Sequence, residues 1–123
     1  MERSERARGC LVGVAVGDAL GFPLEGLSAR RVRRRFGALQ DYRFLGSTGF
    51  VSDDTEQTVM LGESIVTAAG DPKRSAGLFG SRLVGWFWTI PPGVGLATVR
   101  ASLKLTVGLA GGVTSAGNGA AMR

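Results

Sequence analysis

The sequence of 123 residues contains no histidine and only one cysteine, Cys10. The lack of histidine excludes Ser-His-Asp and Cys-His catalysis and every histidine-containing zinc site. A single cysteine can form neither an internal disulfide nor a thiolate metal cage. Because its neighbours Gly9, Leu11 and Val12 are small or apolar, we expect Cys10 to be a buried structural thiol.

Long hydrophobic runs are also missing. The apolar stretch 11–24 is interrupted by Asp18 and is shorter than the roughly 20 residues that a membrane-spanning helix needs. The N-terminus does not show the signal-peptide pattern of basic and then apolar residues. We therefore expect no membrane partner and a cytoplasmic protein.

What is present is one domain's length of chain, with 44% hydrophobic residues, a net charge of +5 and 20 glycines. Hydrophobic periodicity and capping residues predict an all-α fold without strands. The expected helices run from a cap at Ser4 to about Leu20, over Ser28–Phe36, from Ser52 to about Ala69, from Pro72 to before Pro91, and from a cap at Thr98 to Gly111-Gly112. Four glycines spaced i, i+4 in the first helix, at positions 9, 13, 17 and 21, predict a central, buried element against which another backbone packs.

Two acidic features are candidates for chemistry. Ser52-Asp53-Asp54-Thr55-Glu56 places two adjacent carboxylates and two hydroxyls at a helix start, and these are hard oxygen ligands that suit Mg²⁺ or Mn²⁺. Helix capping alone also explains this pentapeptide. Asp18 lies inside an apolar, glycine-rich helix, which is costly unless the carboxylate is hydrogen-bonded or functional. Glu25 follows that helix as either a loop carboxylate that reaches a cleft or a solvated side chain.

Two further segments have alternative interpretations. Ser115-Ala116-Gly117-Asn118-Gly119 is either an anion-binding loop whose backbone N–H groups approach a phosphate or a glycine-rich turn. The arginines between Arg30 and Arg35 allow a nucleic-acid interface, but no aromatic residues interleave them, and the run favours a solvated helix face.

These features occur in an order that resembles the N-terminal part of the ADP-ribosylglycohydrolase family, which includes dinitrogenase reductase-activating glycohydrolase. The residues that carry the resemblance are 9–21 with Glu25, then Ser52-Asp53-Asp54-Thr55, then 117–123. The resemblance implies an all-α helical bundle around a dinuclear Mg²⁺ or Mn²⁺ centre. It also implies hydrolysis of the glycosidic bond between ADP-ribose and a protein side chain or another acceptor.

The resemblance also assigns roles to individual residues. Ser52, Asp53 and Asp54 fall where the family has its first metal ligands, and Glu25 falls where some members have a catalytic glutamate. The residues that match the loop holding the ADP-ribose diphosphate are Ser115, Gly117, Asn118 and Gly119.

The family pattern includes a second acidic cluster near the far end of a longer chain, and this sequence has no such cluster. We therefore expect residues 1–123 to be a single partial domain without its C-terminal part, with an incomplete metal-ligand set. Exposed apolar surface would then favour self-association. The alternatives are a non-catalytic ADP-ribose-binding or interaction remnant and, less favoured, a basic nucleic-acid-binding module.

Overall fold

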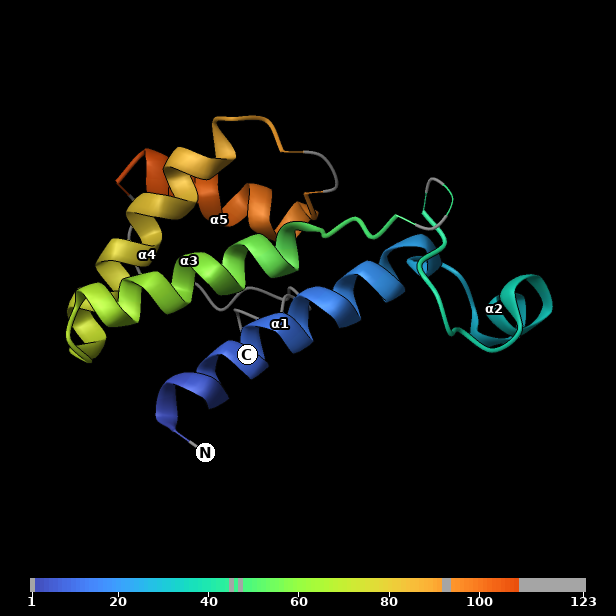
Figure 1. Ribbon diagram of the computed structural model, residues 1–123. Helices are drawn as coiled ribbons and strands as arrows, with labels where there is room; N and C mark the ends of the chain where they lie inside the picture. Colours follow the sequence, from blue (N-terminus) through green and yellow to red (C-terminus); the bar gives the residue numbers. More distant parts are fainter. Residues whose placement is uncertain (1, 45, 47, 92–93, 109–123) are drawn as a thin grey trace. The chain divides into compact units, whose positions relative to one another are not determined.

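The all-α prediction is confirmed by a computed structural model, which describes residues 2–44, 46, 48–91 and 94–108. These residues contain no strand, only an isolated antiparallel bridge between Phe44 and Thr48. Their helices are α1 (Arg3–Gly21), the 3-10 helix η1 (Phe22–Leu24), α2 (Ala29–Phe36), α3 (Asp53–Thr67), α4 (Pro72–Phe87) and α5 (Leu96–Thr106) (Figure 1).

The chain divides into two compact units, the first ending at Thr55 and the second beginning at Glu56. The first holds α1, η1, α2 and the start of α3, and the second holds the rest of α3 with α4 and α5. The expectation of a single partial domain stays a prediction.

Helix α1 is largely exposed, and Ala19 is its one buried residue. A Cβ added at any glycine of the stripe would meet no atom of the described residues within 4 Å. Cys10 is also exposed. The expected burial of α1 and of Cys10 is therefore wrong within the first unit, because no described segment of that unit packs on that face.

By length and composition alone, the continuous helical stretch Arg3–Leu24 could cross a membrane, with a mean hydropathy of 1.3 over its most apolar window. One such helix near an N-terminus is a weak indication, since core helices of soluble proteins and signal sequences have the same composition. The absence of a membrane partner stays a prediction.

An aromatic cluster packs at the C-terminal end of α1. The ring centroids of Phe22, Phe44 and Phe50 lie 5.1–5.3 Å apart. A Cβ on Gly49 would lie 3.2 Å from ring atoms of Tyr42 and 3.3 Å from the Cβ of Ala19, so the chain approaches α1 as closely as only glycine allows without adjustment. This packing brings the segment before α3 against the end of α1.

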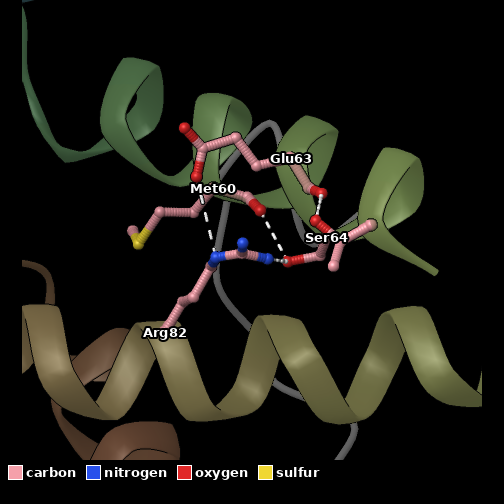
Figure 2. Close-up of polar contacts among 5 residues, drawn as sticks. Met60, Glu63, Ser64 and Arg82 are labelled. Atoms are coloured by element: carbon pink, nitrogen blue, oxygen red, sulfur yellow. Dashed lines mark hydrogen bonds and ion pairs between the residues drawn. The ribbon is translucent and has the colours of Figure 1, made fainter.

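In the second unit, a buried serine and an arginine connect α3 with α4 (Figure 2). Arg82 Nη1 donates to Ser64 Oγ at 2.8 Å, and that hydroxyl donates to the carbonyl oxygen of Met60 at 2.7 Å. Arg82 Nε also lies 3.6 Å from a carboxylate oxygen of Glu63. These contacts fix the side of α3 that faces α4, whose Leu83 is buried.

Helix α5 packs against α4 in the same unit. The indole Nε1 of Trp88 donates to Thr106 Oγ1 at 3.3 Å, and a Cβ on Gly80 would lie 3.6 Å from Leu105. Buried Thr98 and Ser102 lie on α5, so small polar residues supply much of the interior here.

The predicted helix boundaries are partly confirmed. Ser28 and Asp71 cap α2 and α4, accepting from backbone N–H groups at 3.4 and 2.8 Å, respectively. The predicted cap at Ser4 is wrong, because the N-cap of α1 is Glu2, two residues earlier, whose N–H donates to the carboxylate of Glu5.

The predicted boundaries of α5 are wrong at both ends. Its N-cap is Gly95, and Thr98 lies buried within the first turn. The helix ends at Thr106, where Gly108 adopts a φ of 73°. A glycine in this left-handed conformation ends a helix readily, and it comes before Gly111-Gly112, which lie outside the described residues.

Candidate functional site

Asp18 connects the C-terminal half of α1 to the first turn of α3. Its Oδ2 accepts from the backbone N–H of Ser52 at 2.8 Å, from the backbone N–H of Thr55 at 3.3 Å, and from the hydroxyl of Thr55. Ser52 and Thr55 are buried, with 5% and 8% of their surfaces exposed. A carboxylate that accepts the N–H groups at a helix start also meets the positive end of the helix dipole. Asp18, the acid in the apolar helix, is therefore hydrogen-bonded, which offsets the free-energy cost of placing a carboxylate there.

Ser52 is the side-chain cap of α3. Its Oγ accepts from the backbone N–H of Asp54 at 3.3 Å. An N-cap hydroxyl usually accepts from the N–H of the second or third helical residue in this way. The capping interpretation of Ser52 is thus confirmed. This bond uses one lone pair of the hydroxyl oxygen, so it does not exclude a metal-ligand role.

Asp53 and Asp54 occupy the first two positions of α3, and both are half-buried. Loss of hydration on burial raises the pKa of Asp53 above its usual value, and the neighbouring charge of Asp54 raises it further. A backbone hydrogen bond lowers this pKa, while Glu25 and Asp18 raise it. The carboxyl of Asp53 thus lies close to several negatively charged side chains.

Glu25 is the C-cap of η1, and its N–H donates to the carbonyl oxygen of Phe22 at 3.3 Å. The residue is exposed overall. Partial loss of hydration is the largest cause that raises the pKa of Glu25, and the negative charges of Asp18 and Asp54 raise it further. The structure therefore brings the predicted catalytic glutamate into electrostatic reach of the predicted metal-ligating turn.

The described residues contain no group of three or more His, Cys, Asp or Glu side chains placed to hold a metal ion. Carboxylate oxygens are the ligands that Mg²⁺ and Mn²⁺ prefer, so the chemistry of the donors fits. Their number and convergence do not close a site. The incomplete ligand set stays a prediction, and so do the roles of Ser52, Asp53 and Asp54 as metal ligands.

One residue of this cluster was not predicted as a site residue, and one predicted segment is not described. Asp18 organises the turn, and its signal in the sequence was an acid at an otherwise apolar position of a glycine-rich helix. The predicted diphosphate loop lies outside the described residues, and so do its residues Ser115, Gly117, Asn118 and Gly119.

Comparisons with known proteins agree with the resemblance noted above. Residues 1–123 match the family model described as ADP-ribosylglycohydrolase, a family of hydrolases that are generally metal-dependent. An uncharacterized protein of Archaeoglobus fulgidus is 42% identical over 130 residues, which cover 97% of this chain and 41% of that relative. The chain thus spans about two fifths of the length of the curated relative it matches. No solved structure matches the chain.

Proposed function

The chain belongs to the ADP-ribosylglycohydrolase family, and from that premise we propose that it takes part in hydrolysing the glycosidic bond between ADP-ribose and a protein side chain or another acceptor. The single observation that carries this proposal is the arrangement around Asp18. Its hydrogen bonds to Ser52 and Thr55 hold the first turn of α3 next to the end of α1. Asp53, Asp54 and Glu25 thereby form one acidic cluster.

In this proposal Asp53 and Asp54, with the hydroxyl of Ser52, are ligands of Mg²⁺ or Mn²⁺. A bound divalent cation would polarise the ribose hydroxyls and lower the pKa of a nearby water. The mutual repulsion of the carboxylates supports this role, because a cation would relieve it. The remaining coordination positions would be filled by water and by groups outside the described residues.

Glu25 is proposed as the proton-transferring residue. Its raised pKa brings the carboxyl closer to neutral pH, where a general acid or base is most effective. Its exposure leaves the side chain accessible to a substrate. The loop with Ser115, Gly117, Asn118 and Gly119 is proposed to hold the diphosphate of ADP-ribose through backbone N–H groups.

We further propose a cytoplasmic location without a membrane partner. Self-association is proposed through exposed apolar residues, several of which lie on α1 and α3. They include Leu11, Val12, Val16, Val59, Ile65 and Val66.

The test is calorimetric titration of the full chain with Mn²⁺ and with ADP-ribose, together with an assay for ADP-ribose release from an ADP-ribosylated arginine peptide. We expect Mn²⁺ binding in the wild type and its loss in an Asp53→Ala, Asp54→Ala double variant. Asp41→Ala, which removes an exposed aspartate that is not among the charges acting on Asp53 or Glu25, is the control. Glu25→Gln should abolish release while metal binding remains.

Binding of ADP-ribose without Mn²⁺ binding or turnover would support the alternative function, a non-catalytic ADP-ribose-binding protein. The incomplete set of carboxylates in the described residues is the observation that favours this alternative. A folded chain that binds neither Mn²⁺ nor ADP-ribose would contradict both functions.

A further inference from the structure

The hydroxyl of Thr55 makes a long-range contact that other helical hydroxyls do not make. In α3, α4 and α5, several serine and threonine hydroxyls donate to the carbonyl oxygen four residues earlier in the chain. These are the hydroxyls of Ser64, Thr67, Ser75, Ser81 and Thr106. Thr55 donates instead to Oδ2 of Asp18, which lies 37 positions away on α1. Its side chain therefore connects two helices.

The same carboxylate oxygen holds the acidic turn on both sides. Oδ2 of Asp18 accepts from the backbone N–H of Ser52 at 2.8 Å and from the backbone N–H of Thr55 at 3.3 Å. Asp53 and Asp54 lie between these two points of attachment. Because Ser52 and Thr55 are buried, the bonds lie where little water competes for them, which strengthens them. The backbone that carries both carboxylates is thus fixed at each end.

A close approach of the chain to α1 supports this attachment. Ala19, the neighbour of Asp18, is buried, and a Cβ on Gly49 would lie 3.3 Å from its Cβ. Gly49 comes three residues before Ser52, so the chain is already against α1 when it reaches the acidic turn. All of these residues belong to the first unit, and the arrangement is a property of that unit alone.

We propose that Asp18 and Thr55 are positioning residues for the divalent cation that Asp53 and Asp54 are proposed to bind. The inference rests on the proposed function and adds two residues to it. Asp18 and Thr55 act here through their hydrogen bonds and do not bind the cation themselves. Hydrogen-bond partners behind metal-ligating groups hold the ligands in the geometry that the metal needs, and their loss usually weakens metal binding by about 10–100-fold.

The effect on the cation follows from the conformations of the turn. Apparent affinity falls in proportion to the fraction of molecules whose turn has the binding geometry. The bonds to Asp18 hold the turn in one conformation before a cation arrives, so binding does not have to order it. Without the Thr55 hydroxyl this fraction decreases, although every proposed ligand is still present.

The experiment is calorimetric titration of the full chain with Mn²⁺. The test variant is Thr55→Val, which removes the hydroxyl without changing the net charge or the shape of the side chain. Thr55→Ser restores a hydroxyl at the same position. The matched control is Thr67→Val, the same substitution on the same helix, where the lost hydroxyl bonds only to the carbonyl oxygen of Glu63.

We expect Mn²⁺ affinity to fall about tenfold in Thr55→Val and to stay within about twofold of the wild type in Thr55→Ser and Thr67→Val. Ser64→Ala separates positioning from stability, because it removes a buried hydroxyl of α3 outside the acidic turn. Urea unfolding gives the stability of each variant. An equal loss of affinity in Ser64→Ala and Thr55→Val would overturn the proposal, since general destabilisation would then explain both.

Asp18→Glu replaces the test variant if Thr55→Val does not fold. It keeps the negative charge but moves the carboxylate by one methylene group. Weaker Mn²⁺ binding by the folded Asp18→Glu variant supports the positioning role, and unchanged binding overturns it.

The outcomes distinguish this inference from the proposed function. Equal Mn²⁺ affinity of the wild type and Thr55→Val overturns the positioning role and leaves the proposed hydrolysis standing. Weaker binding by Thr55→Val, together with no release of ADP-ribose by the wild type, supports the positioning role and contradicts the hydrolysis. A wild type that does not bind Mn²⁺ overturns both.

Discussion

Asp18 is the residue whose removal should affect the acidic turn most. In Asp18→Ala, the N–H groups of Ser52 and Thr55 and the hydroxyl of Thr55 lose their common acceptor. Two of these three donors belong to backbone that is almost fully buried, so water replaces the lost acceptor poorly. We therefore expect a large loss of folding stability from this one substitution.

The magnitude follows from the bonds themselves. A hydrogen bond to a charged acceptor contributes about 1.5–3 kcal/mol. The bond from Ser52 at 2.8 Å and the bond from the Thr55 hydroxyl count in full, whereas the bond from the Thr55 N–H at 3.3 Å is weak. Removing the Asp18 charge also relieves repulsion on Glu25 and Asp53, which offsets part of the loss. The net cost is about 3 kcal/mol.

Urea unfolding followed by circular dichroism measures this cost. With a slope of about 1.5 kcal/mol/M, typical of a chain of this size, the midpoint should fall by about 2 M. Asp18→Asn keeps an oxygen acceptor and should lose about half as much. Asp41→Ala is the control for removing a carboxylate that has no such bonds.

A double-mutant cycle decides whether the loss comes from these bonds. Thr55→Val removes the hydroxyl but keeps the shape of the side chain. The coupling between Asp18→Ala and Thr55→Val should exceed about 1 kcal/mol, as for residues in one hydrogen-bonded network. Equal stability of Asp18→Ala and Asp41→Ala, or strict additivity in the cycle, would refute the bridging role of Asp18.

Further predictions concern four single positions. Arg82→Ala leaves the buried hydroxyl of Ser64 without its donor and should cost about 1–2 kcal/mol in urea unfolding, with Arg82→Lys closer to wild type. Gly49→Ala places a methyl group 3.2–3.3 Å from Tyr42 and Ala19 and should destabilise by about 1 kcal/mol, whereas Gly13→Ala should stabilise by about 1 kcal/mol, both measured by thermal unfolding. The pKa of Asp53 is raised on folding, so between the two pKa values the folded state holds a proton that the unfolded state has released. The stability that this group contributes is therefore present at low pH and is lost as pH rises through the raised pKa. In chelator-containing buffer, Asp53→Asn should therefore stabilise the protein at neutral pH but not below pH 3.8, the ordinary pKa, and a gain that persists at lower pH would contradict this origin.

The sequence predicted the fold class, most helices and the capping role of Ser52. Ser28, Ser52 and Asp71 are short polar residues directly before helices, and each accepts a backbone N–H. Such bonds are local, so they follow from the order of residues. Thr98 fails as a cap because α5 begins earlier, and a buried polar side chain inside a helix looks the same in sequence as a cap.

The acidic cluster was only partly predictable, because it depends on contacts between distant positions. Asp18 lies more than 30 positions from Ser52, and nothing in the spacing of either residue specifies their bond. The sequence indicated only that an acid in an apolar helix requires a partner. The family resemblance named Glu25 and Asp53, but the shifts of their pKa values come from packing that only the structure provides.

The glycine stripe of α1 shows how far a pattern determines burial. Glycines at four successive i, i+4 positions weaken a helix, by about 1 kcal/mol each relative to alanine, so the stripe favours a closely packed backbone partner. No described segment of the first unit fills that role at Gly9, Gly13 or Gly17. The stabilisation expected for Gly13→Ala therefore depends on an open stripe. A loss of stability in that variant would mean that a backbone from outside the first unit's described residues packs there.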